Sequence, residues 1–180
     1  VHYTRLQIFD ESDPRENYRI YQWANRLHVT TREEVIASQV LVHSGDDYNA
    51  RLIEETARLL RRRKYLYDAE VRLVNLCADK VDIEVITRDI WSFTPEATIK
   101  RSGGENTHRF SLRETNILGS GQELALVSKK DLDRETTQFA YKNNNLRGSR
   151  VAGRVVYSDN DDGSDELLLL RLPFYSLDAR

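Results

Sequence analysis

The sequence has little cysteine and proline, no methionine, and no long apolar run. Its 180 residues contain one cysteine and three prolines. The single cysteine, Cys77, excludes an internal disulfide and leaves the redox compartment open. No apolar run approaches the roughly 18 residues of a membrane-spanning helix. Membrane-spanning strands stay possible, because their alternating side chains give only a weak hydropathy signal.

Charge of neither sign dominates the sequence. The net charge is -2, although 31% of the residues are charged. This balance gives no sign of a general affinity for nucleic acid, so nucleic acid is not an expected partner. The basic run from Arg61 to Lys64 closes a predicted helix and suits its negative end. The chain begins Val-His-Tyr without an initiator methionine, which predicts that it is cut or processed from a longer protein.

No residue pattern indicates catalysis or metal binding. The histidines show no metal-ligand spacing and lie near no cysteine pair: His2, His28, His43 and His108. The loop 158–163 resembles a calcium loop, but Ser158 stands at the first ligand position and Leu169 at the closing one. Glu54 and Glu55 are expected to be helix surface charges, not an acid–base pair. We therefore expect a protein that is not an enzyme and needs no metal or cofactor.

Residues 1–90 combine helices with a few strands. A short alternating run from Leu6 to Phe9 predicts a strand, and the segment from Asn17 to His28 predicts a helix. Thr31 and Glu34 form a capping box, which predicts the start of a short second helix. The apolar spacing from Asn49 to Arg63 predicts a longer one. Its inner face would hold Leu52, Ile53, Thr56, Leu59 and Leu60.

Three aromatic residues stand close together in the first predicted helix. Tyr18, Tyr21 and Trp23 do not follow a clean helical spacing. We expect them to pack in the core beneath this helix, because buried aromatic rings dominate core packing. The alternative is that they line a groove for a bound chain.

A β-hairpin closes this part of the chain. Residues Glu70–Leu76 and Val81–Ile86 both alternate, and Ala78–Lys80 forms a tight connection between them. With the early strand, the predicted order is β-α-α-β-β. The sequence therefore predicts an α+β domain over residues 1–90, long enough to hold its own core.

The remaining residues, 91–180, repeat a hairpin. Turns near Ile117, Leu146 and Phe174 follow one another at intervals of 29 and 28 residues. The alternating runs are Trp91–Lys100, Arg109–Arg113, Gln122–Lys130, Glu135–Lys142, Val151–Tyr157 and Glu166–Leu172. Such a meander fits an up-and-down barrel, and the hairpin is about long enough to cross a membrane twice. We expect an all-β antiparallel meander that is the partial start of a transmembrane β-barrel.

Several motifs together resemble a known family. Residues 26–36 (RLHVTTREEVI), 45–48 (GDDY), 52–60 (LIEETARLL) and 65–69 (YLYDA) look like a POTRA domain, a β-α-α-β-β module. Residues 87–95 (TRDIWSFTP), 102–106 (SGGEN), 116–119 (NILG) and 173–178 (PFYSLD) are similar to the start of the barrel in the BamA/TamA-like surface-antigen family. The motifs occur in the expected order and cover nearly the whole chain.

The resemblance implies a non-enzymatic factor for outer-membrane protein assembly, insertion or translocation. Residues 1–90 would lie in the periplasm, and the barrel would span the bacterial outer membrane. The implied partners are unfolded outer-membrane or secreted client chains, the lipid bilayer and periplasmic accessory proteins. Clients would add as a strand to the edge formed by Glu70, Val71, Arg72, Leu73, Val74, Asn75 and Leu76, which is chemically plausible for any open edge. The first barrel strand would form a lateral seam through Trp91, Phe93, Ala97 and Ile99.

Two other functions remain open from the sequence. Alternation alone also permits a small soluble barrel or curved sheet that binds an apolar ligand. That alternative predicts apolar side chains pointing inward, whereas a lipid-facing wall predicts the reverse. The chain could also be the carrier of a hydrolase domain located upstream of Val1.

Overall fold

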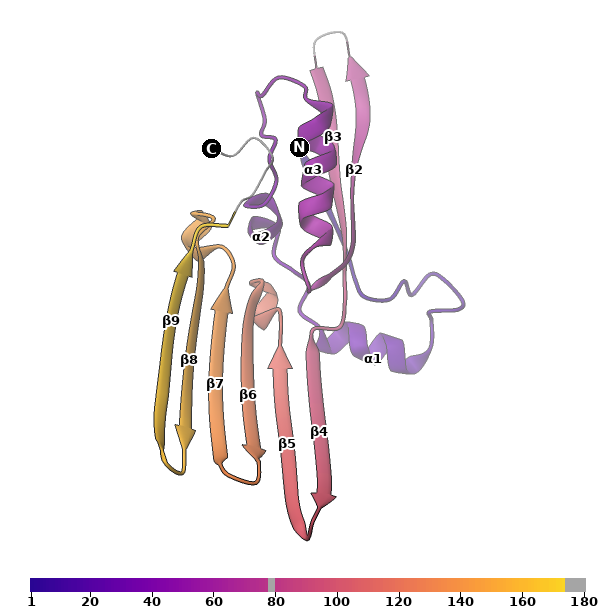
Figure 1. Cartoon of the computed structure of the whole chain (residues 1–180). Coiled ribbons are helices and arrows are strands. Elements are labelled where there is room, and N and C mark those ends of the chain that lie inside the picture. Colours follow the sequence, from indigo (N-terminus) through magenta and orange to yellow (C-terminus); the bar gives the residue numbers. More distant parts are fainter. Residues whose placement is uncertain (78–79, 174–180) are drawn as a thin grey trace. The chain divides into compact units, whose positions relative to one another are not determined.

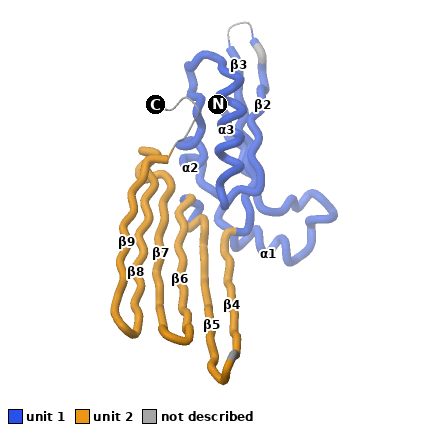
Figure 2. Tube along the Cα trace, viewed as in Figure 1, with its two compact units in different colours: residues 1–91, 118–120, 176–180 blue, residues 92–117, 121–175 orange. Residues whose placement is uncertain are grey.

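The chain folds into two compact units in the computed structural model, which describes residues 1–77 and 80–173. Among the described residues, unit 1 holds Val1–Trp91 together with Leu118–Ser120, and unit 2 holds Ser92–Ile117 and residues 121–173 (Figure 2). The predicted connection at Ala78–Lys80 falls largely outside the described residues, as does most of the turn predicted around Phe174.

Unit 1 packs helices on a small mixed sheet (Figure 1). Its elements are β1 (His2–Leu6), α1 (Arg19–Leu27), α2 (Glu33–Ala37), α3 (Ala50–Arg61), β2 (Leu66–Cys77) and β3 (Lys80–Asp89). The strand order is β1-β3-β2, with β1 parallel and β2 antiparallel to β3. Three helices therefore lie between the first and second strands, one for each predicted helical segment, so the predicted order β-α-α-β-β counts one helix too few.

The core of unit 1 lies between α2, α3 and one face of the sheet. Alternate residues of β3, from Ile83 to Asp89, are buried because the helices cover one face of this central strand. Asn49 caps α3 by accepting from the backbone amides of Arg51 and Leu52. The core cluster is Ile36, Val40, Val42, Ile53, Leu60, Tyr65, Leu66, Ala69, Ile83 and Val85. The predicted inner face of the long helix is therefore confirmed, with Leu52 only partly buried. The expectation that Glu55 is a surface charge is wrong: its side chain is buried and accepts from Arg58 at 2.7 Å.

The first strand lies earlier than predicted. It runs from His2 to Leu6 and not from Leu6 to Phe9, because its register is set by parallel pairing with β3. Phe9 has a different environment. Its ring stacks on Tyr21 with centroids 4.2 Å apart, and its backbone N–H and C=O both bond to the side chain of Asn25.

The predicted capping box is wrong, although the helix it announced exists. α2 follows Arg32, and no side-chain hydrogen bond caps it. Thr31 instead donates its hydroxyl (2.9 Å) and its backbone amide (2.7 Å) to Oδ2 of Asp89. The Thr31 hydroxyl therefore points to Asp89, at the end of β3, and not to an amide of the first helical turn. A hydrogen bond to an ionised carboxylate is stronger than one between two neutral groups.

Leu118–Ser120 belongs to unit 1 through main-chain contacts. The backbone amide of Arg32 donates to the Gly119 carbonyl at 2.9 Å, and its Nε donates to the Leu118 carbonyl at 3.1 Å. Gly119 has a φ of 73°, and a Cβ there would lie 2.5 Å from the Thr30 carbonyl oxygen. Only glycine fits this position without a shift of the backbone.

Unit 2 is a single antiparallel meander of long strands. The strands are β4 (Phe93–Ser102), β5 (Glu105–Glu114), β6 (Gln122–Lys130), β7 (Glu135–Asn143), β8 (Ala152–Asn160) and β9 (Gly163–Arg171). They pair in sequence order from β4 to β9 (Figure 1). This confirms the predicted six-stranded meander, with β4 beginning at Phe93 and not at Trp91. The loop predicted from Asp159 to Asp165 is shorter, since the last strands extend to Asn160 and from Gly163.

Two turns of the meander share one conformation. Asn116 Oδ1 accepts from the Gly121 amide at 2.7 Å, and Asn145 Oδ1 accepts from the Arg150 amide at 2.8 Å. Both turns contain a 3-10 turn with two residues at positive φ: Leu118 (49°) and Gly119 (73°) in one, Arg147 (51°) and Gly148 (75°) in the other. The two turns, 29 residues apart, thus repeat the asparagine hydrogen bond and the backbone conformation as well as the alternating strands beside them.

Candidate functional site

The two faces of the six-stranded sheet differ in chemistry. One face, here called the outward face, carries large apolar side chains in directly paired positions. Leu112, Leu126, Phe139 and Tyr157 form an unbroken cross-strand row over β5 to β8. All four are exposed, with Leu126 at 46%. A second row contains Leu124, Tyr141, Val155 and Leu168.

In β5 to β8 the opposite face combines small or branched side chains, which are buried, with long polar ones, which are half-buried or exposed. Val127, the immediate neighbour of Leu126, is only 6% exposed. The buried residues of this face are Ser111, Ala125, Val127, Thr136, Ala152, Val156 and Ser158. Long polar side chains such as Arg113 and Gln138 stand opposite them across the strands. In β5 to β8 the largest apolar groups therefore lie on the outward face, and water would meet them there at a cost.

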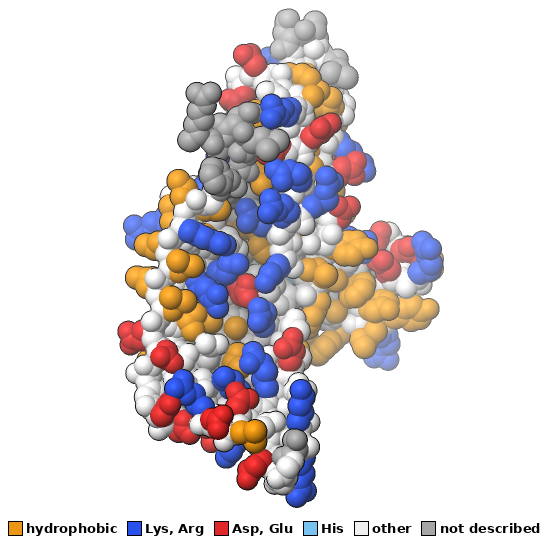
Figure 3. All heavy atoms as spheres, in the orientation of Figure 1, with side chains coloured by type: hydrophobic (Ala, Val, Ile, Leu, Met, Phe, Trp, Pro, Cys, Tyr) orange, Lys and Arg blue, Asp and Glu red, His pale blue; other side chains and the backbone are white. Residues whose placement is uncertain are grey.

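The hairpin tips at the far end of this sheet are polar (Figure 3). Arg134, in the loop between β6 and β7, donates to Asp162 at 2.5 Å and lies 3.7 Å from Asp165. These contacts raise the pKa of Arg134, chiefly through the hydrogen bond to Asp162. They join two neighbouring tips. Leu132, at the same tip, is an exposed apolar side chain.

The predicted seam residues lie at the open edge of this sheet. Phe93, Ala97 and Ile99 share the outward face of β4, which pairs only with β5 among the described strands. Trp91 precedes the strand and belongs to unit 1. Pro95 lies in the middle of β4, where it has no N–H to donate. Proline within a strand is typical of an edge.

The predicted client edge, Glu70–Leu76, lies within β2, an edge strand of the other sheet. β2 pairs only with β3 among the described strands, so its outer side carries no strand neighbour there. Arg72 donates to Glu70 at 2.6 Å, and this hydrogen bond holds the pKa of the Glu70 carboxyl below its ordinary value. The pair is exposed and therefore adds little to stability.

Two features restrict pairing along β2. Its register shifts between Leu73 and Asn75, so a bulge interrupts the predicted segment at Val74. Arg61 of α3 donates to the carbonyl of Ala69 at 3.0 Å. Bulges and charged side chains are common protections of exposed edges. An added strand would therefore find its regular stretch before Leu73.

A buried polar cluster at the end of β3 was missed by the sequence reasoning. His28 Nε2 lies 2.8 Å from Asp89 Oδ2, and the two side chains are 4% and 0% exposed. Thr31 completes the cluster. The signal was available, because the alternation through Ile83 and Val85 places Asp89 on the buried face. The cluster joins the end of α1 to the last residue of β3, and so fixes the segment that leads into β4.

The aromatic residues of α1 are not in the core, so that expectation is wrong for two of them. Trp23 and Tyr18 are exposed, although the ring of Tyr18 meets Tyr21 edge-on, and Tyr21 in turn stacks on Phe9. The reason is that Asn25, not an aromatic residue, faces the body of unit 1. The described residues contain no group of His, Cys, Asp or Glu side chains placed to hold a metal ion. Within the same residues, no helix is long and apolar enough to cross a membrane.

Comparison with known proteins identifies a solved structure of similar fold. An antiparallel meander of nine- and ten-residue strands is the architecture of an up-and-down barrel wall. No family model and no curated protein matches the sequence. Among solved structures, the chain is similar to the crystal structure of BamA from Haemophilus ducreyi lacking POTRA domains 1-3. The TM-score is 0.55 at 14% identity, and the match covers 88% of this chain but only 28% of that one. The chain therefore has a BamA-like fold over a small part of that protein's length.

Proposed function

We propose that this chain is part of an outer-membrane barrel protein that assembles, inserts or translocates other proteins and catalyses no reaction. Unit 1 acts as a periplasmic POTRA-like module, and unit 2 supplies the first strands of the barrel. The BamA-like fold supports this proposal. The chain covers only part of such a protein, so the client and the accessory partners belong to the proposal as well.

One observation carries the proposal: in β5 to β8 the large apolar side chains are exposed on the outward face, while the small side chains of the other face are buried among long polar ones. Leu126 and Val127 are neighbours in β6, yet the larger side chain is the exposed one. In water this arrangement is unfavourable, whereas in a bilayer the outward side chains meet acyl chains. A soluble ligand-binding barrel needs the opposite arrangement, and no observation here favours it.

Cysteine labelling in native membranes tests the membrane wall. The background is Cys77→Ser, because Cys77 is exposed. Single cysteines replace Phe93 and Ala97 on the outward face of β4, and Thr94 and Thr98 on the other face. We expect a water-soluble maleimide to label the two threonine positions and spare the other two. Labelling of Phe93 and Ala97 alone would favour a sheet closed around an apolar cavity.

Client capture follows from two open edges. An extended client adds to β2 by main-chain hydrogen bonds, before the bulge at Val74, and then passes to the edge of β4. Pro95 reduces the number of amide donors on β4, which weakens any strand pairing at this edge and suits a seam that opens.

Photo-crosslinking tests the β2 edge. A crosslinking amino acid replaces Val71 or Leu73, and the matched control replaces Tyr48, an exposed residue of the same unit. We expect nascent outer-membrane proteins to crosslink at the two edge positions well above the Tyr48 background. Equal crosslinking at all three positions would show that clients do not add to β2. The proposal that unit 2 forms a barrel wall would still stand.

A further inference from the structure

α1 exposes an apolar face to solvent. Ile20, Trp23 and Leu27 are 68%, 61% and 53% exposed, and their i, i+3, i+7 spacing places them on one side of the helix. Tyr18, just before the helix, is exposed too. Figure 3 shows apolar side chains gathered over α1. A tryptophan and two branched aliphatic residues on an exposed face of unit 1 serve no packing role within the described residues.

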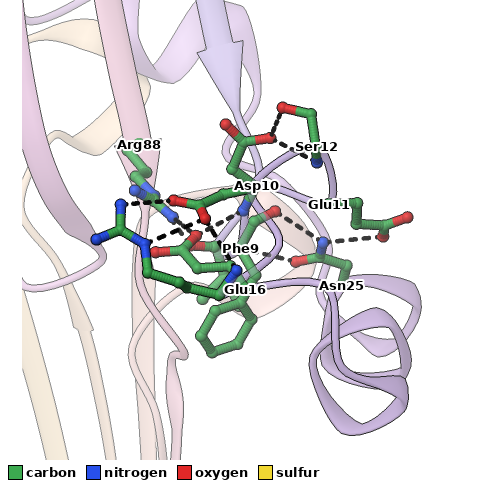
Figure 4. Close-up of polar contacts among 10 residues, drawn as sticks. Phe9, Asp10, Glu11, Ser12, Glu16, Asn25 and Arg88 are labelled. Atoms are coloured by element: carbon green, nitrogen blue, oxygen red, sulfur yellow. Dashed lines mark hydrogen bonds and ion pairs between the residues drawn. The ribbon is translucent and has the colours of Figure 1, made fainter.

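The rotation of α1 is fixed by its other side. Asn25 is buried, and its side chain bonds the backbone of Phe9 and the carboxylate of Glu11, as Figure 4 shows. The ring of Tyr21 stacks on Phe9. His28, directly after the helix, bonds Asp89. With these contacts in place, the apolar face cannot turn inward.

The charges of α1 are all positive. Arg19 and Arg26 are its only charged residues, and at 100° per residue both lie along one border of the apolar face, on the side of Trp23. Two of the four acidic side chains of the preceding loop are paired with arginine: Glu16 accepts from Arg88, and Asp13 from Arg15 (Figure 4 shows the Arg88 contact). The other two, Asp10 and Glu11, accept from Ser12 and Asn25. An apolar face with tryptophan, bordered by arginine, is the composition of a helix that lies in the interface of an anionic membrane.

The covalent chain keeps α1 near a membrane-spanning strand. His28 contacts Asp89 at 2.8 Å, and only residues 90–92 separate Asp89 from Phe93, the first residue of β4. Four residue steps reach at most about 14 Å. The linking residues Ile90 and Trp91 are themselves partly exposed and apolar. The headgroup layer at the start of β4 is therefore within reach of α1.

We propose that the apolar face of α1 docks on the anionic headgroup layer of the membrane that unit 2 spans. Ile20, Trp23 and Leu27 enter the interface, while Arg19 and Arg26 contact lipid phosphates. The helix thereby holds unit 1 against the bilayer surface. This inference rests on the proposed function, because it needs the wall of unit 2 to be in lipid.

Quenching by brominated lipid tests the proposal on the full chain in vesicles of phosphatidylcholine and phosphatidylglycerol. Trp23 and Trp91 are the two tryptophans, so Trp91→Phe leaves Trp23 as the reporter. The wall reporter is Phe139→Trp, and the surface control is Tyr48→Trp. Both are made with Trp23→Phe and Trp91→Phe. Acyl chains brominated close to the headgroup quench only a tryptophan that enters the membrane.

We expect Trp23 and the wall reporter to lose most of their emission and the Tyr48 reporter to lose little. Replacing Ile20→Ser and Leu27→Ser, two exposed positions that the fold does not need, should restore Trp23 emission. If the wall reporter is quenched and Trp23 behaves like the Tyr48 control, docking of α1 is overturned and the wall stands. A Trp23 that is shielded only by another protein chain gives that same result. If neither is quenched, the membrane wall and the docking both fail.

Discussion

The two sheets use the same alternation of side chains with opposite outcomes. In β3 of unit 1, alternate residues from Ile83 to Asp89 are buried beneath the helices. In β6 of unit 2, the covered residues are Ala125 and Val127, while the larger Leu126 is exposed. A period of two shows that a strand has two different faces, but not which face meets water. The size of the side chains on each face and the presence of covering helices decide that.

The largest expected effect is on the free energy of unfolding, when a leucine in the helix-covered core is compared with a leucine on the outward face. Leu60 is fully buried in α3. Leu60→Ala should lower the free energy of unfolding of unit 1 by about 2–5 kcal/mol, through lost burial and the cavity left behind. The measurement is denaturant unfolding of the vesicle-bound chain, followed by Trp23 emission. Leu126→Ala, the matched change in unit 2, should leave this transition unmoved. Equal shifts would mean that the two sheets share one core.

A charge on the outward face should distinguish the two faces of unit 2. Leu126→Arg places a cation in the middle of the apolar row and should cost about 2–4 kcal/mol in a bilayer. Gln138→Arg, on the other face of β7, should cost little, since long polar side chains already stand there. Strand circular dichroism during urea unfolding from vesicles gives both values. A larger penalty for Gln138→Arg would reverse the assignment of the faces.

The twin turns offer a matched pair of glycines. Gly119 and Gly148 have nearly equal φ, but a Cβ at Gly119 meets the Thr30 carbonyl and one at Gly148 meets nothing. Gly148→Ala should cost only the left-handed strain, about 1–2 kcal/mol. Gly119→Ala should cost roughly 1–3 kcal/mol more, because its Cβ also overpacks the contact with the Thr30 carbonyl. Thermal unfolding of the two variants provides the comparison. Equal losses would show that the Thr30 contact contributes nothing.

The smallest expected effect concerns the height of the apolar band. On β6 the large outward apolar residues are Leu124 and Leu126. Counting half the distance to the next outward residue at each end, they cover roughly 14 Å of strand. The apolar band of a typical barrel is about 25 Å tall. The chain should therefore insert more completely into short-chain lipids than into long-chain ones, with a difference of fractions of a kcal/mol per Å of mismatch. Insertion yield measured by protease protection across a chain-length series tests this. A preference for the thickest bilayer would contradict the band as described.

Local sequence patterns predicted the long helices and strands. Features that depend on residues far away in the sequence could not be predicted in this way. Helix α3 and strand β6 follow from spacing alone, and the turn at Asn145 repeats the turn at Asn116 in sequence. The position of β1 did not follow, because parallel pairing to β3 sets it. The role of Thr31 did not follow either, since its acceptor, Asp89, lies far along the chain. The exposed Trp23 contradicts the ordinary tendency of aromatic residues to be buried, and the proposed docking of α1 on lipid accounts for it.

The central claim is that the outward face of unit 2 contacts lipid. A spin-label scan of β6 from Leu124 to Lys129, in the intact protein in bilayers, tests it most directly. Oxygen concentrates in lipid and a water-soluble nickel complex stays in water, so the two accessibilities report the solvent at each site. The account predicts that they alternate out of phase, with oxygen highest at Leu124 and Leu126. High nickel accessibility at these two positions would show that the apolar face meets water, and the membrane wall would be wrong.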